Sequence, residues 1–126
     1  MSEREAFGRS INKFQVLRHR IAQMSAEIEM NKEFVHGLYR RYEDGDYLVK
    51  KASMAKLLAT QLSDKVTFDC LQMFGGYGYM EDYPMARMWR DARLGQIGGG
   101  TSEILCEIIA KTLIDGRGYN AAIEKH

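Results

Sequence analysis

The sequence predicts an all-α protein, an antiparallel bundle of helices. Three observations lead to this fold class. Apolar residues recur at steps of three and four over long stretches, which is the pattern of an amphipathic helix. A single proline in 126 residues leaves room for long uninterrupted helices. No stretch alternates apolar and polar residues for long enough to form a strand, so short turns between helices favour an antiparallel bundle.

The first helix is predicted over residues 10–44. Its apolar positions follow the helical period and miss it only at Asn31; they are Phe14, Leu17, Ile21, Met24, Ile28, Val35, Leu38 and Tyr42. Gly45 provides the stop, because glycine adopts the left-handed conformation that follows a helix at little cost. Asp46 is expected to cap the helix that comes next.

A second helix is predicted over residues 47–73. Its apolar stripe includes small alanines that would let a neighbouring helix approach closely; its members are Leu48, Ala52, Ala55, Leu58, Leu62, Val66 and Cys70. Gly75, Gly76 and Gly78 end this helix, because three glycines in four positions cost too much backbone entropy inside it. Pro84 suits the first turn of a short third helix over residues 83–94.

The last helix is predicted over residues 101–115, directly after a run of three glycines at 98–100. Thr101 can cap its first turn, and Gly116 ends it. Residues 1–116 are therefore expected to form one helical domain, followed by a weakly ordered tail at 117–126.

Composition excludes several classes of function. Eighteen basic residues against 17 acidic ones leave a formal charge of +1, so the chain has no overall field that would attract nucleic acid. Its apolar stretches are too short for a membrane span or for the core of a signal peptide. Cys70 and Cys106 form no C-x-x-C pattern, which favours a reducing compartment: the cytoplasm or, in a eukaryote, the mitochondrial matrix.

Two glycine-rich segments, residues 72–78 and 98–103, could carry function. Each lies at the end of a predicted helix, where missing side chains let the backbone approach a ligand and where a helix N-terminus favours phosphate. The alternative is that both only separate helices. A nucleotide-binding helical module that uses residues 98–100 alone is a further possibility. No metal site is expected, because His19, His36 and His126 lie far apart without metal-binding spacing.

Six short motifs, taken in order and spacing, resemble the C-terminal domain of acyl-CoA dehydrogenases. They occupy residues 4–8, 14–15, 72–79, 83–84, 90–93 and 97–104. The resemblance runs from Arg4 to about Leu113. It implies that this chain is part of a flavoprotein that also has an N-terminal helical domain and a central β-domain. It further implies a bundle that lacks the first of the family's four C-terminal helices.

The resemblance implies FAD as the cofactor. In R-x-x-F-G, Arg4 would contact the pyrophosphate of the neighbouring subunit's FAD, with Phe7 next to it, while T-S-E at 101–103 would meet the FAD of its own subunit. The implied cofactor contacts are Arg4, Phe7, Phe14, Gln15, Gln72, Met73, Phe74, Gly75, Gly76, Thr101, Ser102 and Glu103. Gly99 and Gly100 are the implied substrate contacts.

One position departs from many members of the family. The family reaction forms trans-2-enoyl-CoA from an acyl-CoA thioester, and it needs a carboxylate base for the α-proton. That glutamate often stands where this chain has Gly99, so no catalytic residue is assigned here. The isolated chain is therefore expected to be inactive, and a non-catalytic helical assembly module is the alternative function.

The implied partners are an acyl-CoA substrate, an electron-transfer partner and further copies of the same chain. Self-association is expected through an apolar face of the first two helices, because a contiguous exposed apolar patch is unfavourable in water. The residues proposed for this face are Leu17, Ile21, Met24, Ile28, Leu58 and Leu62.

Overall fold

The structure, a computed structural model, describes residues 5–118. It confirms the all-α fold class and the antiparallel arrangement. Its elements are β1 (Glu5–Ala6), β2 (Arg9–Ser10), the 3-10 helix η1 (Ile11–Lys13), α1 (Gln15–Glu43), α2 (Val49–Phe74), α3 (Gly76–Tyr79), α4 (Met85–Leu94) and α5 (Ser102–Ile114). The predicted helices at 10–44, 47–73, 83–94 and 101–115 correspond to α1, α2, α4 and α5.

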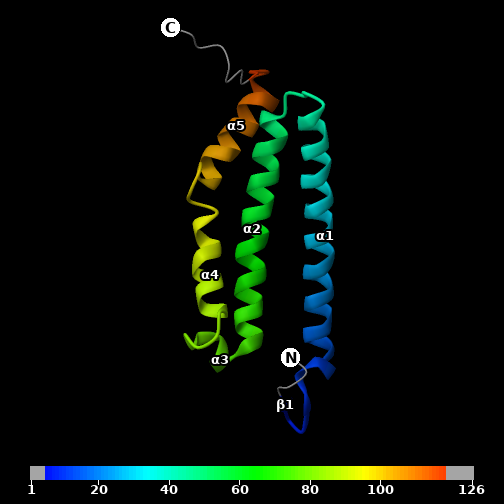
Figure 1. The fold of residues 1–126 in the computed structure, drawn as a ribbon, viewed down its shortest axis with the longest axis vertical. Helices are drawn as coiled ribbons and strands as arrows, with labels where there is room; N and C mark the ends of the chain where they lie inside the picture. Colours follow the sequence, from blue (N-terminus) through cyan, green and yellow to red (C-terminus); the bar gives the residue numbers. More distant parts are fainter. Residues whose placement is uncertain (1–4, 119–126) are drawn as a thin grey trace.

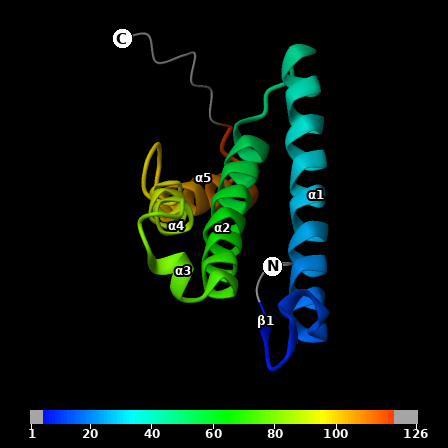
Figure 2. The same ribbon diagram turned by 60° about the horizontal axis from the view of Figure 1, so that its bottom comes forward.

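The central element is α2, which packs against α1 on one side and against α4 and α5 on the other. Figure 1 shows α4 and α5 following one another along the same side of α2, both antiparallel to it. The turned view in Figure 2 shows α2 standing between α1 and α4, with α5 passing behind α2. The bundle is therefore open, and α1 is packed on one side only.

The start of α1 differs from the prediction. Residues 5–13 form a two-stranded hairpin and a turn of 3-10 helix, so the α-helix begins at Gln15 rather than near residue 10. In the hairpin, Glu5 pairs with Ser10 and Ala6 with Arg9. Two-residue strands are too short to show an alternating pattern, which is why no pattern in the sequence indicates them.

The turn between α1 and α2 confirms one prediction and corrects another. The helix α1 ends at Glu43, and Gly45 has a φ of 86°, the left-handed conformation expected of it. Asp46, however, does not cap α2. Its carboxylate accepts a 2.7 Å hydrogen bond from Arg41 Nε, and Leu48 occupies the N-cap position without a side-chain hydrogen bond. The nearby guanidinium competes successfully for the carboxylate.

The glycine segment after α2 forms a break followed by a further helical turn. Gly75 ends α2 with a φ of 60°, and residues 76–79 form the one-turn helix α3, which the sequence pattern does not predict. Gly78 is buried against the end of α2. A Cβ at this position would lie 2.6 Å from the carbonyl oxygen of Leu71 and 2.9 Å from Cβ of Phe74.

The hydrophobic core is small and gathers around α2. The buried apolar residues are Ile11, Met24, Leu48, Ala55, Met73, Met85 and Leu105. Ala52 and Leu58, which belong to the stripe predicted for this helix, are exposed. Because α2 is covered from two sides, its burial is spread around the helix instead of following one stripe.

An ion pair and a hydrogen bond connect α2 to the segments on either side of it. Lys65 Nζ on α2 lies 2.7 Å from both carboxylate oxygens of Glu27 on α1. On the other side of α2, Asp64 Oδ2 accepts a 2.9 Å hydrogen bond from Gln96 Nε2. The Lys65–Glu27 pair is exposed, so it adds little stability.

The packing at Gly78 predicts a large difference between two neighbouring glycines. Gly78→Ala should lower the free energy of unfolding by about 1–3 kcal/mol, because the new methyl group overlaps the backbone of α2. Gly76→Ala is the matched control, since a Cβ added there would have nothing within 4 Å of it. Urea unfolding of both variants measures the difference. Equal stabilities would contradict a close contact between Gly78 and α2.

Candidate functional site

The predicted site residues lie in two places along α2. The first, the α2-end cluster, contains the hairpin tip, the start of α1 and the end of α2: Phe7, Phe14, Gln15, Gln72, Met73, Phe74, Gly75 and Gly76. The second, the glycine-loop cluster, contains Gly99, Gly100, Thr101, Ser102 and Glu103, where the loop after α4 meets α5. The two clusters are about 27 Å apart along α2, from the 1.5 Å rise of the 18 residues between Lys56 and Phe74.

The hairpin presents an aromatic side chain at its tip. Phe7 has a φ of 53° and Gly8 a φ of 76°, which together make the two-residue turn between the strands. The Phe7 side chain is 97% exposed, and its ring meets Phe14 edge-on at 6.5 Å. The guanidinium of Arg9 lies 4.3 Å from the centre of the Phe14 ring. Arg4 lies outside the described residues.

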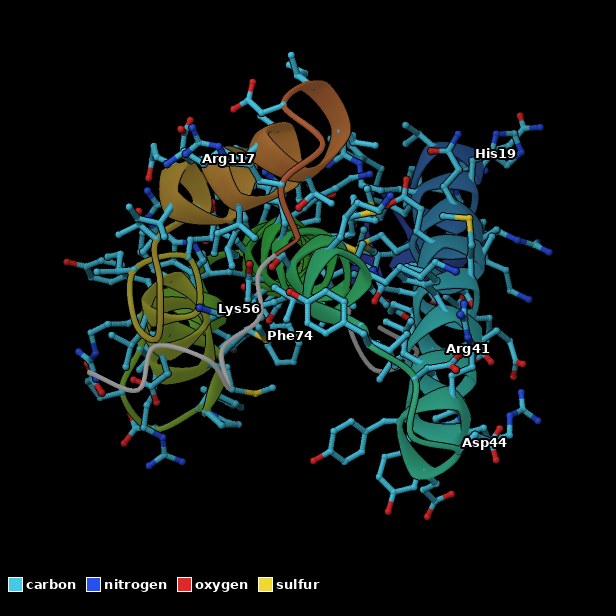
Figure 3. All side chains as sticks on the ribbon, turned by 90° about the horizontal axis from the view of Figure 1, so that it is seen from above. His19, Arg41, Asp44, Lys56, Phe74 and Arg117 are labelled. Carbon is cyan, nitrogen blue, oxygen red and sulfur yellow. The ribbon has the colours of Figure 1, made fainter. Side chains whose placement is uncertain are left out.

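The end of α2 mixes exposed and buried members of the predicted site. Gln72 is exposed, Met73 is buried in the core, and the Phe74 ring meets Tyr83 edge-on at 6.5 Å. Figure 3 shows Phe74 beside α2, between that helix and α4. On the α1 side, a hollow of about 330 Å³ lies between the two helices; its apolar walls include Ile21, Met24, Ile28, Val66, Cys70, Met73 and Phe74.

The glycine loop is tied to α2 by one lysine that the sequence did not identify. Lys56 Nζ donates hydrogen bonds to the carbonyl oxygens of Gly98, Gly99 and Gly100, at 2.6, 2.6 and 2.7 Å. Its partners come 42 to 44 residues later and are backbone atoms. No local pattern around Lys56 could therefore have shown this contact.

The N-terminus of α5 carries the three residues of the T-S-E motif. Thr101 is the N-cap, as predicted, and its Oγ1 accepts a 3.3 Å hydrogen bond from the backbone N–H of Ile104. The pKa of the Glu103 carboxyl is lowered, first because its own backbone N–H donates to it and then because the Thr101 hydroxyl does. The motif thus keeps a negative charge at the positive end of the helix.

Two buried polar oxygens among the described residues lack a partner, one in the 3-10 helix before α1 and one in the glycine-loop cluster. These atoms are Oδ1 of Asn12, just before Phe14, and the hydroxyl oxygen of Ser102. An unpaired buried polar atom usually costs about 1–3 kcal/mol. A polar ligand that reached these atoms would remove this cost, so the residues present fit a ligand rich in hydroxyl and phosphate groups.

Other kinds of site find less support in the part of the chain that the structure describes. It contains no group of three or more histidine, cysteine or acidic residues that could hold a metal ion. None of its helices is long and apolar enough to cross a membrane. Burial raises the pKa of the Cys70 thiol, and Asp69 beside it adds to the effect, so this cysteine is a poor nucleophile at neutral pH.

The family model described as "Acyl-CoA dehydrogenase, C-terminal domain" matches residues 1–114. The long-chain specific acyl-CoA dehydrogenase of Sus scrofa mitochondria is 38% identical over 114 residues, which is 90% of this chain and 26% of that protein. The chain therefore spans about a quarter of the length of this relative.

Solved structures show the same likeness. The acyl-CoA dehydrogenase of Geobacillus kaustophilus superimposes with a TM-score of 0.87 at 37% identity, covering 90% of this chain and 30% of that one. The FAD complex of PigA superimposes with a TM-score of 0.83 at 27% identity, covering 89% of this chain and 29% of that one.

The lowered pKa of Glu103 predicts a pH-dependent contribution to stability. A carboxyl whose pKa is lowered by folding stabilises the folded state at pH values above its unfolded pKa, and this contribution disappears as the pH falls through the folded pKa. Glu103→Gln should therefore be less stable than the parent at pH 7, and the difference should shrink below about pH 4. Thermal unfolding across this range measures it. A difference that stays constant down to pH 3 would rule out this role for the carboxylate.

Proposed function

The chain belongs to the acyl-CoA dehydrogenase C-terminal domain family, and from this membership we propose that it is the FAD-contacting and assembly domain of an acyl-CoA dehydrogenase. The reaction proposed for the whole protein is α,β-dehydrogenation of an acyl-CoA thioester to the trans-2-enoyl-CoA, with electrons passed on to a separate electron-transfer partner. The observation that carries the proposal is that the motif residues form two clusters at two separate positions along α2.

The separation of the clusters supports contact with two different cofactors. The resemblance assigns the α2-end cluster, with Arg4, to the FAD of a neighbouring subunit and the glycine-loop cluster to the FAD of its own subunit. A distance of about 27 Å along α2 is too long for one small binding site and suits this division. The FAD complex of PigA has the same fold in this region, which adds support for FAD as the ligand.

The two clusters offer different chemical groups to the cofactor. At the hairpin, the exposed Phe7 offers an aromatic face to the cofactor, and Gln72 offers an amide that both donates and accepts hydrogen bonds. At the start of α5, the hydroxyl of Ser102 and the free end of the helix bind polar groups. When bound, the flavin supplies a hydride acceptor for the β-carbon of the substrate.

The base that removes the α-proton does not come from position 99. Gly99 has no side chain, and its φ of 62° lies in the region that residues with a side chain rarely adopt. We assign Gly99 and Gly100 to contact with the acyl-CoA through their backbone, and the base to residues outside this chain. The 126-residue chain alone should therefore show no turnover.

Self-association completes the proposal. A second hollow, of about 370 Å³, lies between α1 and α2; its apolar walls include Ile28, Val35, Ala59, Leu62 and Val66. Together with the hollow near Met24 it forms a groove along the two helices, which contains Ile21, Met24, Ile28 and Leu62 of the predicted face. We propose that further copies of the chain cover this groove, because each fully buried large apolar side chain contributes roughly 1.5–3 kcal/mol.

Flavin binding by the protein expressed from its complete reading frame tests the proposal. The purified protein should show flavin absorbance that bleaches when an acyl-CoA is added without oxygen. Phe7→Ala should weaken FAD binding about tenfold, as expected for losing about 1.4 kcal/mol of aromatic contact. Because Phe7 is 97% exposed, this variant should fold normally.

Tyr42→Ala is the matched control, since this exposed aromatic lies at the opposite end of α1 and should leave FAD binding unchanged. Equal FAD affinity in Phe7→Ala and the parent would contradict the assignment of the hairpin. A complete protein that holds no flavin would instead favour the non-catalytic assembly module.

A further inference from the structure

The feature that the proposed function leaves unexplained is the contact between Lys56 and three successive carbonyl groups. We infer that Lys56 is a positioning residue: it holds residues 98–100 in the one conformation that presents the start of α5 to the flavin cofactor. This inference rests on the proposed function and adds a residue that none of the motifs contains.

The geometry of the contact uses the full donor capacity of the lysine. An ammonium group has three N–H donors, and Lys56 directs hydrogen bonds of 2.6, 2.6 and 2.7 Å to three different oxygens. Bonds from a charged donor are the stronger kind. Figure 3 shows the Lys56 nitrogen reaching away from α2 to the ribbon that joins α4 and α5. The side chain is half-buried there.

The orientation of the three carbonyls determines the orientation of the N–H groups that follow them. In a trans peptide the C=O of one residue and the N–H of the next point in opposite directions. With the carbonyls of residues 98–100 turned toward Lys56, the N–H groups of Gly99, Gly100 and Thr101 point away from it. None of these three has an acceptor among the described residues. They form a row of free donors that leads into the N-terminus of α5.

The loop needs an external restraint to keep this shape. Three consecutive glycines have more conformational freedom than any other tripeptide, and two of them adopt φ values of 62° and 94°. The preceding part of the loop is close to α2 as well, since a Cβ on Gly95 would lie 3.1 Å from Cγ2 of Thr60. Thr60 is one turn beyond Lys56 on the same helix. Lys56 and Thr60, on two adjacent turns of α2, therefore lie close to the loop at both of its ends.

The residue that follows this loop, Ser102, has a hydroxyl without a partner in the described part of the chain. The backbone N–H of Ser102 donates to the carbonyl oxygen of Gln96 at 3.1 Å, which closes the loop on itself. Its buried hydroxyl faces no acceptor or donor among residues 5–118. A loop fixed by Lys56 thus places the free N–H row and one unpaired hydroxyl together, ready for an electron-rich ligand.

The test is carried out on the protein expressed from its complete reading frame. Lys56→Met keeps the length and apolar stem of the side chain and removes all three donors. It should weaken FAD binding at least tenfold in reconstitution of the apoprotein. Lys65→Met is the matched control, because Lys65 lies on the same helix and pairs with Glu27 on the α1 side. Its FAD affinity should stay within twofold of the parent.

A second variant keeps the inference testable if Lys56→Met does not fold. Lys56→Arg retains the charge, but its planar guanidinium cannot converge on three oxygens around a single nitrogen, so FAD binding should fall by a factor between two and ten. The melting temperature of each apoprotein is measured in parallel, since a purely structural role would lower it and leave the FAD affinity of the folded protein unchanged. Parental FAD affinity in Lys56→Arg or in folded Lys56→Met would overturn the inference. A parent that binds no FAD would overturn the proposed function instead.

Discussion

The whole structure depends on α2 remaining an unbroken helix of 26 residues. It is the element that α1, α3, α4 and α5 all contact. At 1.5 Å per residue it is about 39 Å long, enough for α4 and α5 to lie end to end on one side. Small and large side chains together let neighbours approach from both sides, with Ala55 and Ser53 among those buried. A break in α2 would separate both functional clusters from each other and from the core.

The sequence predicted the helices well because their ends are encoded locally. Gly45, Gly75 and Gly116 all adopt positive φ values just beyond a helix, and Thr101 caps α5, as the residue types alone suggested. The errors arose where a distant or competing contact decided the outcome. Asp46 could cap a helix, but its carboxylate binds Arg41 instead. The hairpin before α1 depends on Phe7 at a φ of 53°, a conformation that phenylalanine rarely adopts and that no pattern predicts.

The site could be predicted only as a set of residues, and its arrangement in space could not. The motifs identified both glycine-rich segments, yet nothing in their spacing showed that they lie about 27 Å apart along one helix. Lys56 is the clearest case. Between Ala55 and Leu57 it looks like any solvated lysine of an amphipathic helix, and its partners are carbonyl groups of glycines. Every residue has a backbone carbonyl group, so the identity of the contacted residues does not reveal such a contact.

The open side of the bundle connects stability with the proposed function. No side chain among the described residues is completely buried, while Val16, Met30 and Tyr39 remain exposed along α1. A helix covered on one side only has few contacts that hold it in place. Under the proposal, α1 gains its missing contacts when further copies cover the groove, and Phe7 at the hairpin before it then reaches the neighbour's cofactor. Assembly and cofactor binding would reinforce each other, because each orders the same end of α1.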